Sequence, residues 1–285
     1  MSYTRPAAVL AALALVGLAA TSADAASLRI ALSGQTAPGN LDIYTVAPNG
    51  DGRQKVTSGQ ADDTLPYFSP ARDQIVFTRK PPSGPRRLFM VRPSGANVHV
   101  LPNTTDGGAP SWSPDGALIA FGAAGDGIHT IKPDGTGGKQ LTDGASDANP
   151  TWSPDSARIA FERGGEIWRM DADGTNLKRL TKKGAQPAWR PNGKNIAFVR
   201  KTNRGGAGKS LAVFLMEPDG SHVAQLTLKG GGAAEKDRRP AWEPNSRHVA
   251  YGATAGGGSK IRTMLIGGAT AATPENVTPG STPAW

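Results

Sequence analysis

Histidines are the side chains of this sequence best suited to acid–base or metal chemistry, because the chain contains no cysteine. The four of them, His99, His129, His222 and His248, lack the short spacing that is typical of zinc ligands. The absence of cysteine excludes disulfide bonds, thiolate metal sites and cysteine nucleophiles. No Gly-x-Ser-x-Gly nucleophile motif occurs either. We therefore predict no catalytic residue, no metal site and no cofactor.

Two short motifs are similar to ligand-binding loops, but each lacks a required residue. Residues 205–210 (GGAGKS) end like a phosphate-binding P-loop, which needs a glycine at position 203 and a following helix; the chain has Asn203 there. Residues 171–174 (DADG) begin like a calcium loop, whose twelfth position needs a bidentate glutamate, and Lys182 stands at that position. The sequence favours a loop before a strand in the first case and a hairpin turn in the second.

The elements that would position any site come from one unit that is repeated six times. Its first half has the form Pro-x-Trp-Ser-Pro-Asp-Gly-x-x-Ile-Ala-Phe and recurs roughly every 43 residues. The copies are PYFSPARDQIVF at 66–77, PSWSPDGALIAF at 110–121, PTWSPDSARIAF at 150–161, PAWRPNGKNIAF at 187–198, PAWEPNSRHVAY at 240–251 and a truncated PAW at 283–285. A second half, of the form Ile-x-x-Met-x-x-Asp-Gly followed by Leu-Thr, lies between them, and its sixth copy, from Ile261 to Thr278, is weak.

Each repeat predicts four short antiparallel strands, which is the composition of a propeller blade. No segment shows helical periodicity with caps. Asp-Gly and Asn-Gly pairs, such as Asp115-Gly116 and Asn192-Gly193, favour tight hairpins, and we expect two-residue connections there. The predicted fold class is all-β: a six-bladed β-propeller of four-stranded antiparallel blades.

The two ends of the repeat region predict how the ring closes. The repeats open on a second-strand motif at residues 28–33 and close on a first-strand motif, Pro283 to Trp285. We expect this C-terminal strand to pair with the N-terminal strands, which removes exposed sheet edges. One aromatic position recurs in every copy and is expected to wedge neighbouring blades together, with stacking on a ligand as the alternative. It is occupied by Phe68, Trp112, Trp152, Trp189, Trp242 and Trp285.

The first 25 residues have the pattern of a signal peptide. Arg5 precedes an apolar run at residues 7–20, and Ala23 and Ala25 are the small residues that a signal peptidase reads. We expect cleavage after Ala25, which leaves residues 26–285 as a single propeller domain. No stretch reaches the roughly 20 apolar residues that a membrane helix needs, so we expect no transmembrane segment. The protein is predicted to be exported, to the periplasm or to the outside of the cell.

The repeat resembles the propeller repeat of TolB. The similarity rests on the two half-motifs given above and covers essentially all of residues 28–285. In TolB this repeat forms the C-terminal propeller of a periplasmic protein that binds partners in the Tol-Pal envelope system. In this sequence the predicted signal peptide precedes the repeats directly, where TolB carries an α/β domain. The resemblance therefore implies a propeller and a protein-binding role without specifying the Tol-Pal system.

The formal net charge of +9 favours an anionic partner if the charge is concentrated on one surface. In a propeller blade, the second-to-third loop and the loop to the next blade lie on the same face. We call it the variable-loop face, because its loops at 79–87, 199–210 and 227–239 differ most between repeats. Residues 175–216 contain no Asp or Glu. We expect a bipolar face, with these basic loops opposite inter-blade loops made acidic by residues that include Asp63 and Asp147.

Eight basic residues on this face are the predicted partner-binding residues. They are Arg86, Arg87, Arg200, Lys201, Arg204, Lys209, Arg238 and Arg239. The leading hypothesis is a non-catalytic, exported scaffold that binds an unidentified protein partner with an acidic surface. Solubility is the alternative explanation for the charge.

Two further hypotheses remain open. One is the binding of an anionic envelope polysaccharide on the same face. The other is a polysaccharide lyase or hydrolase that uses the central channel, which would require converging histidine, carboxylate or arginine side chains. No nucleic acid is expected as a partner, because the basic loops lack clustered aromatic residues. We expect a monomer.

Overall fold

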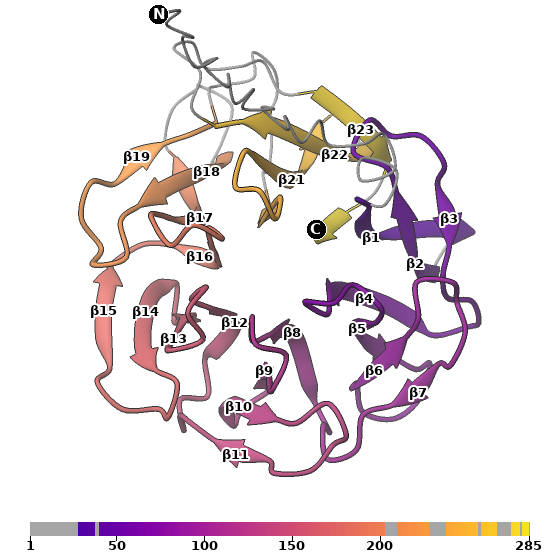
Figure 1. Cartoon of the computed structure of the whole chain (residues 1–285), viewed down its shortest axis with the longest axis horizontal. Coiled ribbons are helices and arrows are strands. Elements are labelled where there is room, and N and C mark those ends of the chain that lie inside the picture. Colours follow the sequence, from indigo (N-terminus) through magenta and orange to yellow (C-terminus); the bar gives the residue numbers. More distant parts are fainter. Residues whose placement is uncertain are drawn as a thin grey trace, which may run out of the picture.

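The computed structural model is a ring of six four-stranded antiparallel sheets around a central axis (Figure 1). It describes residues 28–37, 40–202, 210–227, 238–255, 258–266, 275–279 and 281–284. Every element assigned in these residues is a strand, and none of them forms a helix that is long and apolar enough to cross a membrane. The predicted all-β, six-bladed propeller is confirmed.

Each blade runs from an innermost strand at the axis to a short outermost strand at the rim (Figure 1). Blade 1 contains β24 (Ser281–Ala284), β1 (Ile30–Ala37), β2 (Asn40–Val46) and β3 (Gln54–Lys55). Blade 2 contains β4 (Asp62–Phe68), β5 (Ile75–Lys80), β6 (Arg87–Val91) and β7 (His99–Val100). Blade 3 contains β8 (Gly107–Trp112), β9 (Ile119–Ala123), β10 (Gly127–Ile131) and β11 (Lys139–Gln140).

The remaining three blades follow the same order. Blade 4 contains β12 (Asp147–Trp152), β13 (Arg158–Arg163), β14 (Glu166–Asp171) and β15 (Lys178–Thr181). Blade 5 contains β16 (Ala185–Trp189), β17 (Ile196–Thr202), β18 (Ser210–Met216) and β19 (Ala224–Gln225). Blade 6 contains β20 (Arg238–Trp242), β21 (His248–Ala255), β22 (Gly258–Leu265) and β23 (Glu275–Pro279).

The ring closes through the C-terminal strand. β24 pairs antiparallel with β1, with Ala284 opposite Ala31 and Ser281 opposite Ser33. In Figure 1 the C-terminus therefore lies beside β1, inside the ring. The predicted closure is confirmed, although the strand starts at Ser281 and Trp285 lies outside the described residues. Both ends of the described chain share blade 1, so this blade holds the ring shut.

The hydrophobic core consists of six clusters, each formed by two neighbouring blades. In one of them, Trp152 and Phe161 of blade 4 pack with Ile128 of blade 3. The recurrent aromatic position is buried in five of these interfaces, with exposed fractions of 5–8%. The residues there are Phe68, Trp112, Trp152, Trp189 and Trp242. Each blade therefore buries one sheet face against the preceding blade and one against the next, and the core is continuous around the ring.

Ser113-Pro114-Asp115-Gly116 and the corresponding segments of the other copies form the turns between first and second strands. In blade 3, β8 ends at Trp112 and β9 begins at Ile119, so the predicted two-residue connection is wrong. The physical reason is Pro114, whose fixed φ suits the first central position of a type I turn. The N–H of Gly116 donates to the carbonyl of Ser113 (2.9 Å), and Gly116 ends the turn in the left-handed conformation, at a φ of 74°. The repeated serines are therefore turn residues.

Candidate functional site

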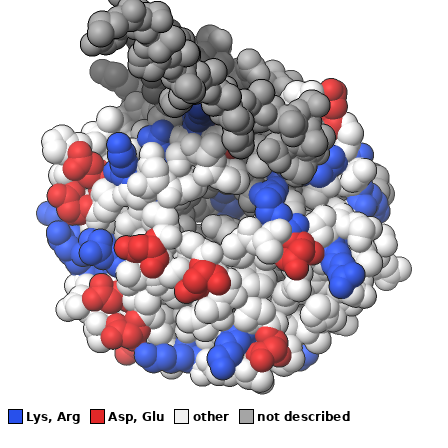
Figure 2. Space-filling view, in the orientation of Figure 1, with Lys and Arg blue, Asp and Glu red and all other residues white. Residues whose placement is uncertain are grey.

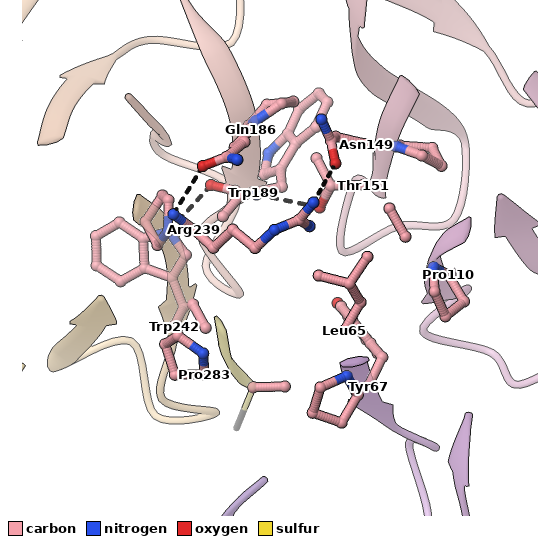
Figure 3. A pocket seen from close by; sticks show the side chains of 18 of the residues that line it. Leu65, Tyr67, Pro110, Asn149, Thr151, Gln186, Trp189, Arg239, Trp242 and Pro283 are labelled. Atoms are coloured by element: carbon pink, nitrogen blue, oxygen red, sulfur yellow. Dashed lines mark hydrogen bonds between the residues drawn. The ribbon is translucent and has the colours of Figure 1, made fainter. Parts of the chain in front are cut away.

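A cavity of about 140 Å³ lies on the propeller axis and is lined by the innermost strands. Its walls carry the residue that directly precedes the repeated proline of each copy. We call these residues the axial ring (Figure 3). In the described side chains the axial ring consists of Leu65, Ala109, Asn149, Gln186 and Arg239. All five are half-buried.

The backbone of each innermost strand is distorted at the axial ring. The strand register shifts there in blades 2 to 6, as in a β-bulge. All five residues have positive φ values, between 47° and 58°. This left-handed conformation is uncommon for residues other than glycine, and it costs on the order of 1 kcal/mol or more at each position. The bulge interrupts the regular alternation of side chains between the two faces of the sheet, and the residue at this position lines the cavity on the axis.

Side chains from other strands hold several of the distorted backbones in place. The N–H of Leu65 donates to Ser33 Oγ (3.3 Å), and the N–H of Ala109 donates to Thr78 Oγ1 (3.3 Å). The N–H of Gln186 donates to Glu162 Oε2 at 3.1 Å. In each of these pairs the acceptor belongs to the preceding blade, so inter-blade packing fixes the geometry of the axial ring.

The axial ring has a polar side and an apolar side. Arg239 Nη2 donates to Asn149 Oδ1 (2.9 Å), across the width of blade 5, and the N–H of Arg239 donates to Gln186 Oε1 (2.9 Å). Asn149 Nδ2 donates in turn to Glu162 Oε2 at 2.8 Å. Figure 3 shows the Arg239 side chain extended towards Asn149, with Leu65 on the opposite wall. This arrangement can bind a ligand that presents hydrogen-bond acceptors to one wall and apolar groups to the other.

A second cavity, of about 340 Å³, adjoins the first at one end of the channel. It shares Leu65, Ala109, Asn149 and Arg239 with the axial cavity and opens between loops of the variable-loop face. We call it the mouth cavity. Its remaining walls are mostly glycine and alanine, and one long basic side chain, Arg86, enters it from the connection between β5 and β6.

The structure places the predicted partner-binding residues in different sectors. Arg86 and Arg239 line the mouth cavity together. Arg87 lines a separate cavity of about 270 Å³ beside Phe89. The guanidinium of Arg200 lies 5.5 Å from the centre of the Phe214 ring, and Lys201 is exposed. Arg204, Lys209 and the side chain of Arg238 lie outside the described residues.

Two features of the predicted charge pattern need correction. Arg238 and Arg239 belong to the innermost strand β20, not to a basic loop, because the bulge of β20 carries Arg239 to the axis. Asp63 and Asp147 add no acidic surface, since both are buried, with exposed fractions of 1% and 4%. They pair with Arg79 and Arg163, each at 2.6 Å. The hydrogen bond that Arg79 donates to Asp63 raises the pKa of Arg79, and the one that Arg163 donates to Asp147 raises the pKa of Arg163.

The exposed charges are mixed in sign. On the face drawn in Figure 2, basic and acidic side chains are both spread around the ring, and the surface is hollowed near the axis. His129 stacks on Phe121, with ring centres 5.5 Å apart, and His248 lies 2.6 Å from Glu243. No group of three or more His, Asp or Glu side chains in the described part of the chain is placed to hold a metal ion.

Sequence reasoning missed most of the axial ring. Of its members only Arg239 was among the predicted residues, and that prediction rested on charge. The available signal was a position that changes identity in every copy while the proline after it recurs: Leu65, Ala109, Asn149, Gln186 and Arg239. Glu162, which joins the polar side, follows the Ile-Ala-Phe motif of blade 4.

Comparison with known proteins establishes the family. A family model described as the TolB beta propeller domain matches residues 94–285. The chain belongs to this family. TolB from Acinetobacter baumannii is similar with a TM-score of 0.75 and 22% sequence identity, over 90% of this chain and 66% of that chain. A putative TolB from Agrobacterium tumefaciens is similar with a TM-score of 0.70 and 19% identity, over 90% and 92% of the two chains.

The structure of an enzyme is also similar. Oligogalacturonate lyase from Vibrio parahaemolyticus is similar with a TM-score of 0.57 and 11% identity, over 88% of this chain and 74% of that chain. These identities show a common fold and no more. This chain spans just under two thirds of the Acinetobacter baumannii TolB chain, at 66%. None of the curated proteins matches the sequence.

Proposed function

We propose that this protein is a non-catalytic, exported propeller that binds an extended, acidic segment of a protein partner at the mouth of its channel. The observation that carries the proposal is the axial ring. A rigid scaffold presents a different side chain at the same distorted position in each of five blades, and variable side chains on a rigid scaffold are the usual basis of specific binding.

Charge at the channel mouth supports an acidic segment. Arg86, Arg239 and Asp147 all line the mouth cavity, and the carboxylate of Asp147 is paired with Arg163. In the part of the chain that the structure describes, no carboxylate forms an ion pair with Arg86. The axial cavity is narrow, at about 140 Å³, which suits an extended chain better than a folded domain. The polar wall and the apolar wall lie on opposite sides of the cavity. An extended peptide suits this arrangement, because its successive side chains point in opposite directions.

Affinity capture from an envelope extract of the source organism tests this proposal. The mature protein is compared with Arg86→Glu and with Lys132→Glu, a matched charge reversal in the connection between β10 and β11, at the opposite end of the blades. We expect the same protein to be captured by the wild type and by Lys132→Glu, and to be lost from Arg86→Glu. Equal capture by all three forms would refute docking at the channel mouth.

Export is the second part of the proposal. It is supported by the signal-peptide pattern of the first 25 residues, which lie outside the described residues. Edman sequencing of the protein purified from the host envelope fraction should begin at Ala26. An N-terminus that still carries residues 1–25 would contradict cleavage at this position.

A further inference from the structure

The innermost strands of blade 3 lack the side chains that fill the corresponding positions of the neighbouring blades. In blade 2, Asp63 lies opposite Arg79, and in blade 4, Asp147 lies opposite Arg163. The same register in blade 3 places Gly107 opposite Ala123. The next pair along the strands is Gly108 opposite Gly122 in blade 3, whereas blade 2 has Thr64 opposite Thr78 and blade 4 has Ala148 opposite Glu162. Comparison with blades 2 and 4 therefore shows which side chains are absent from blade 3.

This loss contributes to the mouth cavity. Gly108, Gly122 and Ala123 all line it, together with Ala124 and Gly125 of the following turn. We call this part of the mouth cavity the blade-3 notch. Its walls are backbone and methyl groups, which pack against the methylene carbons of an acidic side chain. A sugar ring would need more polar side chains along its walls than this notch provides.

Arg86 supplies a positive charge at the edge of the blade-3 notch. Its Nε donates to the carbonyl of Asp106 (3.0 Å), and the N–H of Asp106 donates back to the carbonyl of Arg86 (2.8 Å). A Cβ atom on Gly108 would lie 3.6–3.7 Å from three atoms of the Arg86 guanidinium, so this group rests against the bare backbone of Gly108. The hydrogen bond at Nε orients the guanidinium, and its terminal nitrogens remain as donors for a ligand.

We propose that the blade-3 notch binds the side-chain carboxylate of a glutamate or aspartate in the partner segment, with Arg86 as its cation. Guanidinium and carboxylate form the strongest of the common charge-assisted hydrogen bonds, and they do so with defined geometry. Arg239, which lines the same cavity from the axis, adds positive potential on the channel side. This inference rests on the proposed function, because it assumes a partner segment at the channel mouth, and it names the chemical group that is recognised.

NMR titration of the isotope-labelled protein with N-acetylglutamate N-methylamide tests the blade-3 notch directly. The corresponding glutamine compound is the neutral control, and digalacturonate represents uronic acid polymers. We expect saturable shifts of the Gly108 and Gly122 amide signals with the glutamate probe alone. Arg86→Gln should weaken this binding about tenfold, as expected for the loss of a hydrogen bond to a charged group.

A second variant tests the space of the notch. Gly108→Val keeps the Arg86 residue, fills the notch and packs against the guanidinium, three atoms of which would lie 3.6–3.7 Å from the new Cβ. The backbone accepts a side chain there, because Gly108 has neither a positive φ nor a close backbone neighbour. Gly108→Val should abolish the shifts, whereas Lys132→Gln should leave them unchanged. Equal shifts with the glutamine probe, or binding that survives both Arg86→Gln and Gly108→Val, would overturn the assignment. Tighter, Gly108-dependent binding of digalacturonate would overturn the choice of a peptide.

Failure of this inference can be told apart from failure of the proposed function. If partner capture depends on Arg86 while the glutamate probe shifts neither Gly108 nor Gly122, the docking function stands and the blade-3 notch is overturned. If the probe binds in the notch while capture is the same for the wild type and Arg86→Glu, the notch stands as a carboxylate site and protein docking at the channel mouth is refuted.

Discussion

Replacing Asp147 with alanine removes the acceptor of a buried ion pair. Its carboxylate accepts hydrogen bonds from Arg163 Nε and Nη2, both at 2.6 Å, and from Thr142 Oγ1 at 2.5 Å. The side chain of Asp147 is fully buried, whereas 27% of the Arg163 side chain is exposed. Because Arg163 can reach water after the change, we expect a loss of about 2–3 kcal/mol in the free energy of unfolding, below the cost of breaking a fully buried pair.

The reverse change is expected to cost more. Arg163→Ala leaves a fully buried carboxylate with Thr142 as its remaining side-chain partner, and we expect a loss of about 3–4 kcal/mol. The double variant, Asp147→Ala with Arg163→Ala, should be no less stable than Arg163→Ala alone, so that the coupling energy is at least about 2–3 kcal/mol, the whole effect of Asp147→Ala. Blade 3 supplies the precedent, since Gly107 and Ala123 occupy the same register without any ion pair.

Urea unfolding of the four forms, followed by tryptophan fluorescence, measures these differences. Arg179→Ala serves as a control in the same blade, because Arg179 pairs with Glu166 at 3.3 Å while 44% of its side chain is exposed. It should cost at most about 1 kcal/mol. A double variant that loses the sum of the two single effects would refute the reasoning, since the two charges would then be independent of each other.

Three further outcomes follow from the fold. Trp152→Phe should cost about 1 kcal/mol and Trp152→Ala about 3–5 kcal/mol in urea unfolding, because blade 2 already packs Phe68 at this position. Deletion of residues 281–285 should expose the edge of β1, lower the unfolding midpoint and produce concentration-dependent association in size-exclusion chromatography; an unchanged monomer would contradict closure by β24. Hydrogen bonds from hydroxyl groups and backbone amides lower the pKa of five turn aspartates, so their contribution is present above the unfolded pKa of about 4 and is lost as the pH falls through the lower folded values. These residues are Asp115, Asp134, Asp155, Asp173 and Asp219. The melting temperature should therefore fall below pH 4, and less steeply in Asp155→Asn; identical slopes would contradict this origin.

The fold was predictable because each blade repeats the same requirements. Six copies of one strand and turn pattern specify six similar sheets, and an aromatic residue at a fixed place in each copy specifies how neighbours pack. The turn length was not predictable from Asp115-Gly116 alone. Pro114, just before this pair, moves the turn back by one residue, so the glycine ends a type I turn and is not the second residue of a tight hairpin.

The candidate site was less predictable, because it depends on cross-strand register. The sequence shows Asp63 and Asp147 as charges in loops, and only their positions opposite Arg79 and Arg163 reveal that they are neutralised inside the blades. The axial ring depends on bulges, and nothing in the identity of a leucine or an alanine indicates a left-handed backbone. Sequence reasoning found the charge of Arg239 and missed the backbone geometry that directs it to the axis.

The left-handed backbone of the axial ring is shared with turns elsewhere in the chain. Glycine adopts positive φ most easily, but Arg72, Ser156 and Ser246 also have positive φ, in the turns that correspond to that of Gly116. This chain contains 37 glycines and uses many of them at positive φ in its turns, including Gly116. None of the five described axial positions is a glycine, although each costs on the order of 1 kcal/mol in backbone strain. Hydrophobic packing does not explain this, because the axial side chains lie outside the six hydrophobic clusters. Hydrogen bonds between blades account for the side chains of Asn149, Gln186 and Arg239. Leu65 and Ala109 take part in neither the clusters nor these hydrogen bonds, and theirs are the axial side chains for which we propose a contact with a ligand in the channel.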